Sequence, residues 1–132
     1  MTGTGAATEA SALAAADRII DDFGNHRRDA YFAGFSPDAT FLFHNVDHRL
    51  ESRAAYERLW SEWEDEGFRV HRCLSKNRRV QVYGDVAVFS HDVETEAELG
   101  GVTEVTHERE TIVLAQTAGR WLGVHEHLSA MD

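Results

Sequence analysis

The spacing of apolar residues switches at Gly67 to a period that the rest of the chain keeps, and this change constrains the fold more than any other feature. Before Gly67, apolar residues recur every three or four positions, which is the period of an amphipathic α-helix. After Gly67 the period is two, as in a β-strand with one buried face. Helices followed by a run of strands are typical of an α+β domain. The sequence therefore predicts N-terminal helices packed on one face of a mainly antiparallel sheet.

Three helices and one short strand are predicted before Gly67. The helices are expected over residues 9–24, 27–35 and 53–66. Ser52 can cap the third helix, and Gly67 is placed to end it. The lone proline, Pro37, breaks the chain before a strand predicted over residues 40–46.

Four longer strands, joined by short turns, are predicted after Gly67. They are expected over residues 68–83, 86–99, 102–116 and 121–128. Gly100 and Gly101 can both adopt the positive φ angles of a two-residue type I′ turn. This turn would pair Leu99 with Val102.

A second turn completes the predicted register. The sequence before Arg120 suits a three-residue loop, which would pair Gln116 with Arg120. Counting from both turns places His91 opposite Glu110, and Glu110 opposite Glu126. The two rows beside this one would hold Phe89, Ile112 and Val124, and Val93, Glu108 and Leu128.

The predicted register divides the side chains between two faces of the sheet. The face that carries the His91 row is mainly apolar, so the helices should cover it. The opposite face would hold two polar rows, namely Ser90, Thr111 and His125, and Asp92, Arg109 and His127. An error of one residue in either turn would exchange these partners.

The row of His91, Glu110 and Glu126 is the candidate catalytic site. Ionising two carboxyl groups side by side on a covered apolar face costs free energy, so one of them should have a raised pKa. With an imidazole beside them, they could act as acid and base on a small organic substrate. In the alternative interpretation, these groups are hydrated at the open end of the sheet or pair with an arginine from the helices.

The pair His125 and His127 raises the question of a metal. Two imidazoles need a third ligand, and the predicted neighbours are Thr111 and Arg109, of which the arginine is a poor companion for a cation. A His–Thr hydrogen bond and an ion pair between Asp92 and Arg109 explain this face equally well. We therefore predict no metal site and expect this face to pack against a second subunit.

Composition excludes several classes of function. The 132 residues suit a single domain, predicted over 9–132 after a disordered segment 1–8. The net charge of −10 disfavours nucleic-acid and anionic-membrane partners. Cys73 is the only cysteine, which excludes an internal disulfide and favours the cytoplasm, and no secretory signal is apparent. Nucleotide-binding motifs are absent, and we expect no cofactor.

Residues 109–129 resemble the closing hairpin of the SnoaL-like, nuclear transport factor 2-like superfamily. The shared pattern is a Thr, a turn ending in Gly, a basic residue and Trp, and then Val-His-x-His-x-Ser. Here these are Thr111, Gly119, Arg120, Trp121, Val124, His125, His127 and Ser129. The nearest likeness is to the association domain of calcium/calmodulin-dependent protein kinase II and its stand-alone bacterial relatives. The resemblance implies a cone-shaped fold, in which a strongly bent sheet encloses a pocket, and dimers or rings formed through the sheet.

The resemblance leaves activity open. The superfamily includes ketosteroid isomerases, dehydratases, polyketide cyclases and non-enzymatic assembly domains. The kinase association domain lines its pocket with arginines, and the matching positions here hold Val93, Ile112 and Leu128. That departure favours a largely neutral organic ligand.

Together these inferences predict a homodimer with an apolar pocket for a small organic molecule. Glu110 or Glu126 would be the base, with the other carboxyl or His91 as proton donor. The pocket is expected to be lined by His44, Tyr56, Trp60, Phe89, Ile112, Val124 and Leu128. The alternative is a non-enzymatic ligand-binding or oligomerisation domain.

Overall fold

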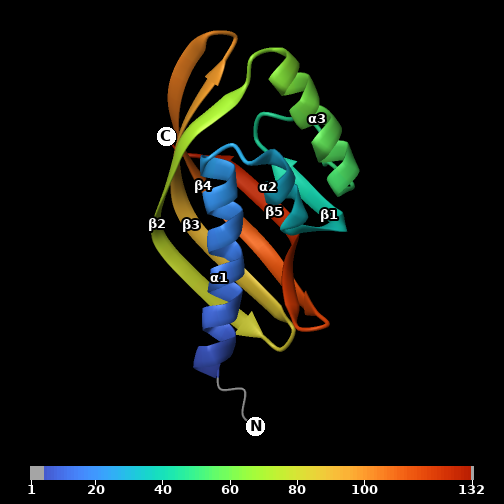
Figure 1. Cartoon of the computed structure of the whole chain (residues 1–132). Helices are drawn as coiled ribbons and strands as arrows, with labels where there is room; N and C mark the ends of the chain where they lie inside the picture. Colours follow the sequence, from blue (N-terminus) through green and yellow to red (C-terminus); the bar gives the residue numbers. More distant parts are fainter. Residues whose placement is uncertain (1–4, 132) are drawn as a thin grey trace.

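The computed structural model describes residues 5–131, which form three helices packed on one side of a curved sheet (Figure 1). The elements in chain order are α1 (Gly5–Gly24), α2 (Arg28–Ala33), β1 (Phe35–Phe43), α3 (Arg53–Asp65), β2 (Arg69–Tyr83), β3 (Val86–Leu99), β4 (Val102–Thr117) and β5 (Arg120–Ala130). The sheet has the order β1-β5-β4-β3-β2, with β1 parallel to β5 and every other pair antiparallel. This arrangement confirms the predicted α+β class. None of the helices within residues 5–131 is long and apolar enough to cross a membrane.

The predicted helices are present with different ends. α3 begins where expected, because the Ser52 hydroxyl accepts a hydrogen bond from the backbone N–H of Ala55 at 3.1 Å. α1 begins at Gly5 rather than at residue 9, so part of the segment predicted to be disordered is helical. The rest of that segment, residues 1–4, lies outside the described residues.

The start of β1 corrects the prediction for the region around Pro37. The strand begins at Phe35, and its register with β5 shifts between Phe35 and Thr40. Because β1 is an edge strand, a proline in this irregular stretch removes no required hydrogen bond from the sheet. Phe35 packs tightly on Gly123, where an added Cβ would lie 2.6 Å from the phenyl ring.

One predicted hairpin is confirmed and the other is wrong. Leu99 pairs with Val102, and Gly100 and Gly101 have φ angles of 59° and 82°. The next turn has two residues rather than three, because Ala118 and Gly119 take φ angles of 53° and 76° and pair Thr117 with Arg120.

A bulge then reverses the effect of this error on the faces of the sheet. The β4–β5 register shifts a second time between Val113 and Leu114. The shorter turn and the bulge each shift the register by one residue relative to the prediction. Every side chain of β5 after the bulge therefore stays on its predicted face but pairs two positions further along β4. Glu126 therefore lies opposite Ile112, and Leu128 lies opposite Glu110, instead of Glu126 opposite Glu110.

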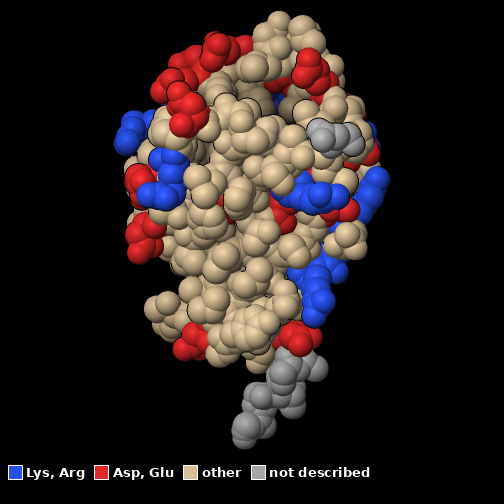
Figure 2. Space-filling view, turned by 180° about the vertical axis from the view of Figure 1, so that it is seen from behind, with Lys and Arg blue, Asp and Glu red and all other residues tan. Residues whose placement is uncertain are grey.

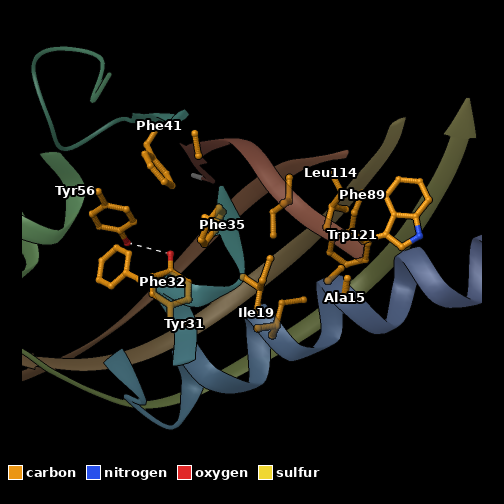
Figure 3. Packing of buried hydrophobic residues seen from close by; sticks show 14 of the residues in the cluster. Ala15, Ile19, Tyr31, Phe32, Phe35, Phe41, Tyr56, Phe89, Leu114 and Trp121 are labelled. Atoms are coloured by element: carbon orange, nitrogen blue, oxygen red, sulfur yellow. Dashed lines mark hydrogen bonds between the residues drawn. The ribbon is translucent and has the colours of Figure 1, made fainter. Parts of the chain in front are cut away.

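The hydrophobic core fills the space between the helices and the inner face of the sheet. Its centre is aromatic, and Figure 3 shows Tyr31, Phe32, Phe35, Phe41 and Tyr56 gathered where α2, α3 and β1 meet. Trp60 of α3 is fully buried in the same cluster. This aromatic cluster borders the pocket described next, since Tyr31 and Tyr56 belong to both.

Candidate functional site

A pocket of about 350 Å³ opens between α1, α3 and the inner face of the sheet. Six aromatic side chains line it: Phe23, Tyr31, Phe43, Tyr56, Trp63 and Phe68. Three carboxyl groups, from Glu108, Glu110 and Glu126, lie along the wall formed by β4 and β5. The exposed lining residues His44, Asn45 and Thr106 mark its mouth.

Glu110 and Glu126 form a hydrogen-bonded carboxyl pair on the pocket wall. They lie diagonally on neighbouring strands, and Glu126 is only 4% exposed. Burial raises the pKa of both groups, and the negative charge and hydrogen bond of Glu110 raise the pKa of Glu126 further. The same hydrogen bond lowers the pKa of Glu110 in part, because Glu110 accepts it. Of the two groups, Glu126 is therefore the one that keeps its proton to higher pH, and Glu110 is the more readily ionised.

Two buried tyrosines that also line the pocket continue the hydrogen bonding of this pair. The Tyr31 hydroxyl donates to Oε1 of Glu126 at 3.1 Å, and the two phenolic oxygens of Tyr31 and Tyr56 lie 3.0 Å apart. In Figure 3 these two hydroxyls point toward each other. Because Tyr31 donates to Glu126, Tyr56 must donate to Tyr31. Burial raises the pKa of both tyrosines well above 10, so both remain protonated donors.

His91 approaches Glu110 from the other side. Its Nε2 lies 2.7 Å from Oε1 of Glu110, and its Nδ1 lies 2.6 Å from the hydroxyl of Ser75. Burial, with a smaller effect of Arg78, lowers the pKa of His91 to about 4, so the ring is neutral at pH 7. A neutral ring has one N–H. Since ionised Glu110 can only accept, Nε2–H then donates to Glu110 and Nδ1 accepts from Ser75.

The pocket mouth holds a second acid–base contact. Nε2 of His44, at the end of β1, lies 2.5 Å from Oε2 of Glu108, and Thr106 donates to the other oxygen of Glu108 at 3.3 Å. Cys73 also lines the pocket, but burial raises the pKa of its thiol to about 12. The protonated thiol is a poor nucleophile.

Only some of the predicted pocket residues line the pocket. His44, Tyr56 and Leu128 lie in its wall, together with Glu110 and Glu126. The prediction is wrong for four others: Trp60, Phe89, Ile112 and Val124. Trp60, Phe89 and Ile112 are 0% exposed in the close-packed core. Val124 occupies the β5 bulge, where it has no partner on β4.

The outer face of the sheet carries the remaining candidates. The Nδ1 atom of His125 lies 2.8 Å from the Thr40 hydroxyl, rather than beside Thr111, which pairs with His127. Arg109 lies opposite Asp92 as predicted, and the two form an ion pair at 3.7 Å. Within residues 5–131, no three His, Cys, Asp or Glu side chains are grouped so that they could hold a metal ion.

Three residues that complete the site were not among the predicted site residues: Tyr31, Ser75 and Glu108. Glu108 stood in a predicted row beside Glu110, so the pattern already placed it on this wall. The alternation of β2 could have placed Ser75 on the inner face with Cys73. The contact between Tyr31 and Glu126 joins residues far apart in sequence, and no local pattern indicates it.

Known structures with this fold cover nearly the whole chain. A ketosteroid isomerase-like protein from Erwinia carotovora atroseptica is 17% identical, with a TM-score of 0.79, covering 94% of this chain and 96% of its own. The calcium/calmodulin-dependent kinase II hub homology domain of Chlamydomonas reinhardtii is 22% identical, with a TM-score of 0.73 and coverages of 95% and 98%. An NTF2-like protein of unknown function from Pseudomonas putida is 17% identical, with a TM-score of 0.77 and coverages of 98% and 90%.

These likenesses establish the α+β NTF2-like fold and leave activity open, since one fold hosts many functions. The chain has no sequence match among curated proteins. The sequence profile of the SnoaL-like domain, in contrast, matches residues 12–132, almost the entire chain. The chain therefore belongs to the SnoaL-like domain family.

Proposed function

We propose that the pocket binds a small, largely apolar organic molecule and that Glu110 and Glu126 transfer protons on it without a cofactor. The observation that carries this proposal is a pair of neighbouring carboxyl groups, both with a raised pKa, at the wall of an aromatic pocket. Such a pair offers a base and an acid at the same place. Isomerisation, dehydration and cyclisation are the reaction classes that need no more than this.

The two carboxyl groups take different roles. Glu110, the more readily ionised of the two, removes a proton from a carbon next to a carbonyl, and the electrons of that C–H bond form the carbon–carbon double bond of an enol. Glu126 gives its proton to the carbonyl oxygen in the same step. Tyr31, which donates to Glu126, keeps this carboxyl oriented and supplies a hydrogen bond as its charge develops.

The lining also indicates the kind of ligand. Among the described lining residues there is no Lys or Arg, while three carboxyl groups are present. A carboxylate or phosphate ligand would therefore meet repulsion without a compensating partner. A neutral molecule with an apolar body and one carbonyl fits the aromatic walls and the acid pair.

Hydrogen–deuterium exchange tests this proposal directly. Enolisable ketones of increasing size, from cyclohexanone to 2-tetralone, are incubated in D₂O, and loss of the α-protons is followed by NMR. We expect wild type to accelerate exchange and Glu110→Gln to lower the rate by about 10² or more, the usual contribution of a general base. Glu104→Gln, at an exposed position of β4 that does not line the pocket, is the matched control and should retain most of the rate. Equal rates for wild type and Glu110→Gln across the series would refute the proposed chemistry.

The second candidate is a non-enzymatic ligand-binding or oligomerisation domain. It is favoured by a mainly uncharged area in the middle of the outer sheet face, bordered by charged side chains (Figure 2). Half-buried apolar residues on this face include Val88, Val113 and Leu122. If this candidate is right, the variant with both Glu110→Gln and Glu126→Gln should gain thermal stability. It should also retain every small molecule that native mass spectrometry finds bound to the purified wild type.

A further inference from the structure

We propose that Ser75 and His91 form a proton path that connects the Glu110–Glu126 pair to a groove on the other side of the pocket wall. The inference rests on the proposed role of this pair and adds how its proton is exchanged with solvent. It is carried by the positions of the four groups relative to two separate spaces in the molecule.

The second space is an open groove of about 730 Å³ between α1 and β2. Ser75 lines this groove and does not line the pocket, whereas Glu110 lines the pocket and not the groove. His91 lines neither space, and its side chain is 0% exposed. The wall between the spaces is thin, because Ile20 and Cys73 line both.

His91 spans this wall with one ring nitrogen on each side. The Ser75 hydroxyl lies 2.6 Å from Nδ1, and Nε2 lies 2.7 Å from Oε1 of Glu110. Both distances are those of short hydrogen bonds. A neutral imidazole can pass a proton through by taking one at the first nitrogen and releasing one from the second.

The donors all point from the groove toward the pocket. Water in the groove gives a proton to the Ser75 oxygen, the Ser75 proton moves to Nδ1 of His91, and the Nε2 proton moves to Glu110. One proton enters at Ser75 and one reaches Glu110, so Ser75 and His91 are neutral again afterwards. The His91 proton is then on Nδ1 instead of Nε2. The reverse transfers carry a proton from Glu110 outward and restore the first tautomer.

Burial keeps the His91 ring of this path neutral, and the charged groups around it act in both senses. Arg78 places its guanidinium 5.3 Å from the centre of the Phe89 ring, which is adjacent to His91, and pairs with Asp17 of α1 at the groove. Asp92, the next residue of β3, acts in the opposite sense to Arg78. A neutral ring between Ser75 and Glu110 is the form that can relay a proton without first becoming a buried cation.

This path has a consequence for a pocket filled by substrate. A bound apolar molecule shields Glu110 and Glu126 from water at the mouth. The groove behind Ser75 stays open, so the pair can still gain a proton and lose it again by the reverse transfers. A reaction that changes the proton count of the pair could then turn over without the pocket emptying.

The test measures how fast the His91 ring proton exchanges with water. In protein labelled with ¹⁵N-histidine, this proton is identified by its loss in His91→Gln, and its exchange is followed by saturation transfer from water. We expect Ser75→Ala and Ser75→Val to slow exchange at least tenfold, with the valine also excluding a replacement water. Ser75→Thr, which keeps the hydroxyl, should restore it. Thr95→Val is the matched control, because it removes a hydroxyl from the pocket side of the neighbouring strand.

The outcomes separate the path from a structural role for Ser75. A looser structure opens more often and would speed exchange, so slower exchange cannot arise from destabilisation. An unchanged rate in Ser75→Ala, or a slower rate in Thr95→Val alone, would overturn the proposal. Because no substrate is present, a protein inactive toward every ketone still answers the question, and its inactivity would count only against the proposed function.

Discussion

At the scale of single residues, the protonation of Glu126 links the site to the stability of the fold. Its pKa is raised on folding, so the folded state keeps a proton that the unfolded chain releases above about pH 4.5. The stability that Glu126 contributes is therefore fully present below its pKa in the unfolded chain. It is lost as the pH rises toward its pKa in the folded protein. Every tenfold difference in proton affinity between the folded and unfolded chain corresponds to about 1.4 kcal/mol of unfolding free energy.

Replacing Glu126 with glutamine should remove this loss, because the amide resembles the protonated acid. We expect Glu126→Gln to melt at least about 3 °C above wild type at pH 8, and within about 1 °C of it at pH 4. Circular dichroism melts at both pH values measure the difference. Glu108→Gln, whose parent carboxylate is paired with His44 at the mouth, should show no such gain at pH 8. A Glu126→Gln variant less stable than wild type at pH 8 would contradict a buried, protonated Glu126.

A second residue, His26, fixes the turn between α1 and α2 to the rest of the fold. Its Nδ1 accepts from the backbone N–H of Val70 at 3.0 Å, and its Nε2 lies 2.8 Å from Glu64 of α3. The ring is mostly buried, with 10% of its side chain exposed. Loss of the ring leaves a buried N–H of β2 without an acceptor.

We expect His26→Asn to lower the free energy of unfolding by about 2 kcal/mol, the cost of an unsatisfied buried donor. Asparagine tolerates the positive φ of 54° at this position, so the change removes the hydrogen bonds and the ring contacts with Trp60 and Phe68 without straining the backbone. His48→Asn in the exposed loop after β1 is the matched control and should change stability by less than about 0.5 kcal/mol. Urea titrations measure both. Equal effects of the two changes would show that the His26 contacts contribute little.

At the scale of elements, Gly123 leaves the space in which Phe35 of β1 packs on β5. Gly123→Ala would place a methyl group 2.6 Å from the Phe35 ring, so either the ring or the strand must move. We expect a loss of about 1–3 kcal/mol in unfolding free energy. Adding Phe35→Leu should recover part of it, as a double-mutant cycle can show. Additive effects of the two changes would mean that the strain lies elsewhere.

The elements also show what the sequence could and could not predict. α3 and the β3–β4 hairpin follow from local signals, namely the Ser52 cap and the Gly100–Gly101 turn. The predicted β4–β5 turn is wrong because Ala118 takes a positive φ, which alanine rarely adopts. The predicted contact of Glu110 with Glu126 depends on a register that is wrong by two residues, and the β5 bulge, which no local signal marks, keeps both side chains on one face.

At the scale of the whole molecule, the mainly uncharged area in the middle of the outer sheet face supports the proposal of a homodimer (Figure 2). Arg109 projects from this face, with 68% of its side chain exposed, and its partner Asp92 lies 3.7 Å away. Arg109→Glu would place two like charges together on the proposed interface.

We expect sedimentation velocity to show wild type at about twice its monomer mass of 14.8 kDa and Arg109→Glu shifted toward the monomer. Arg58→Glu makes the same charge change on the exposed side of α3 and should leave the dimer intact. A dimer of equal strength in wild type and Arg109→Glu would argue that the interface lies elsewhere.

The parallel pairing of β1 with β5 has a consequence for the order in which the protein can assemble. β1 is made early in synthesis, yet its only neighbour in the sheet is the last strand of the sheet to be made. Two contacts cannot form until that strand has been made. They are the packing of the Phe35 ring on Gly123 and the hydrogen bond between Tyr31 and Glu126. Such long-range closure slows folding and leaves apolar surface exposed meanwhile. Until β5 has been made, the helices and the strands β2, β3 and β4 can come together, but the acid pair cannot form, because Glu126 lies on β5.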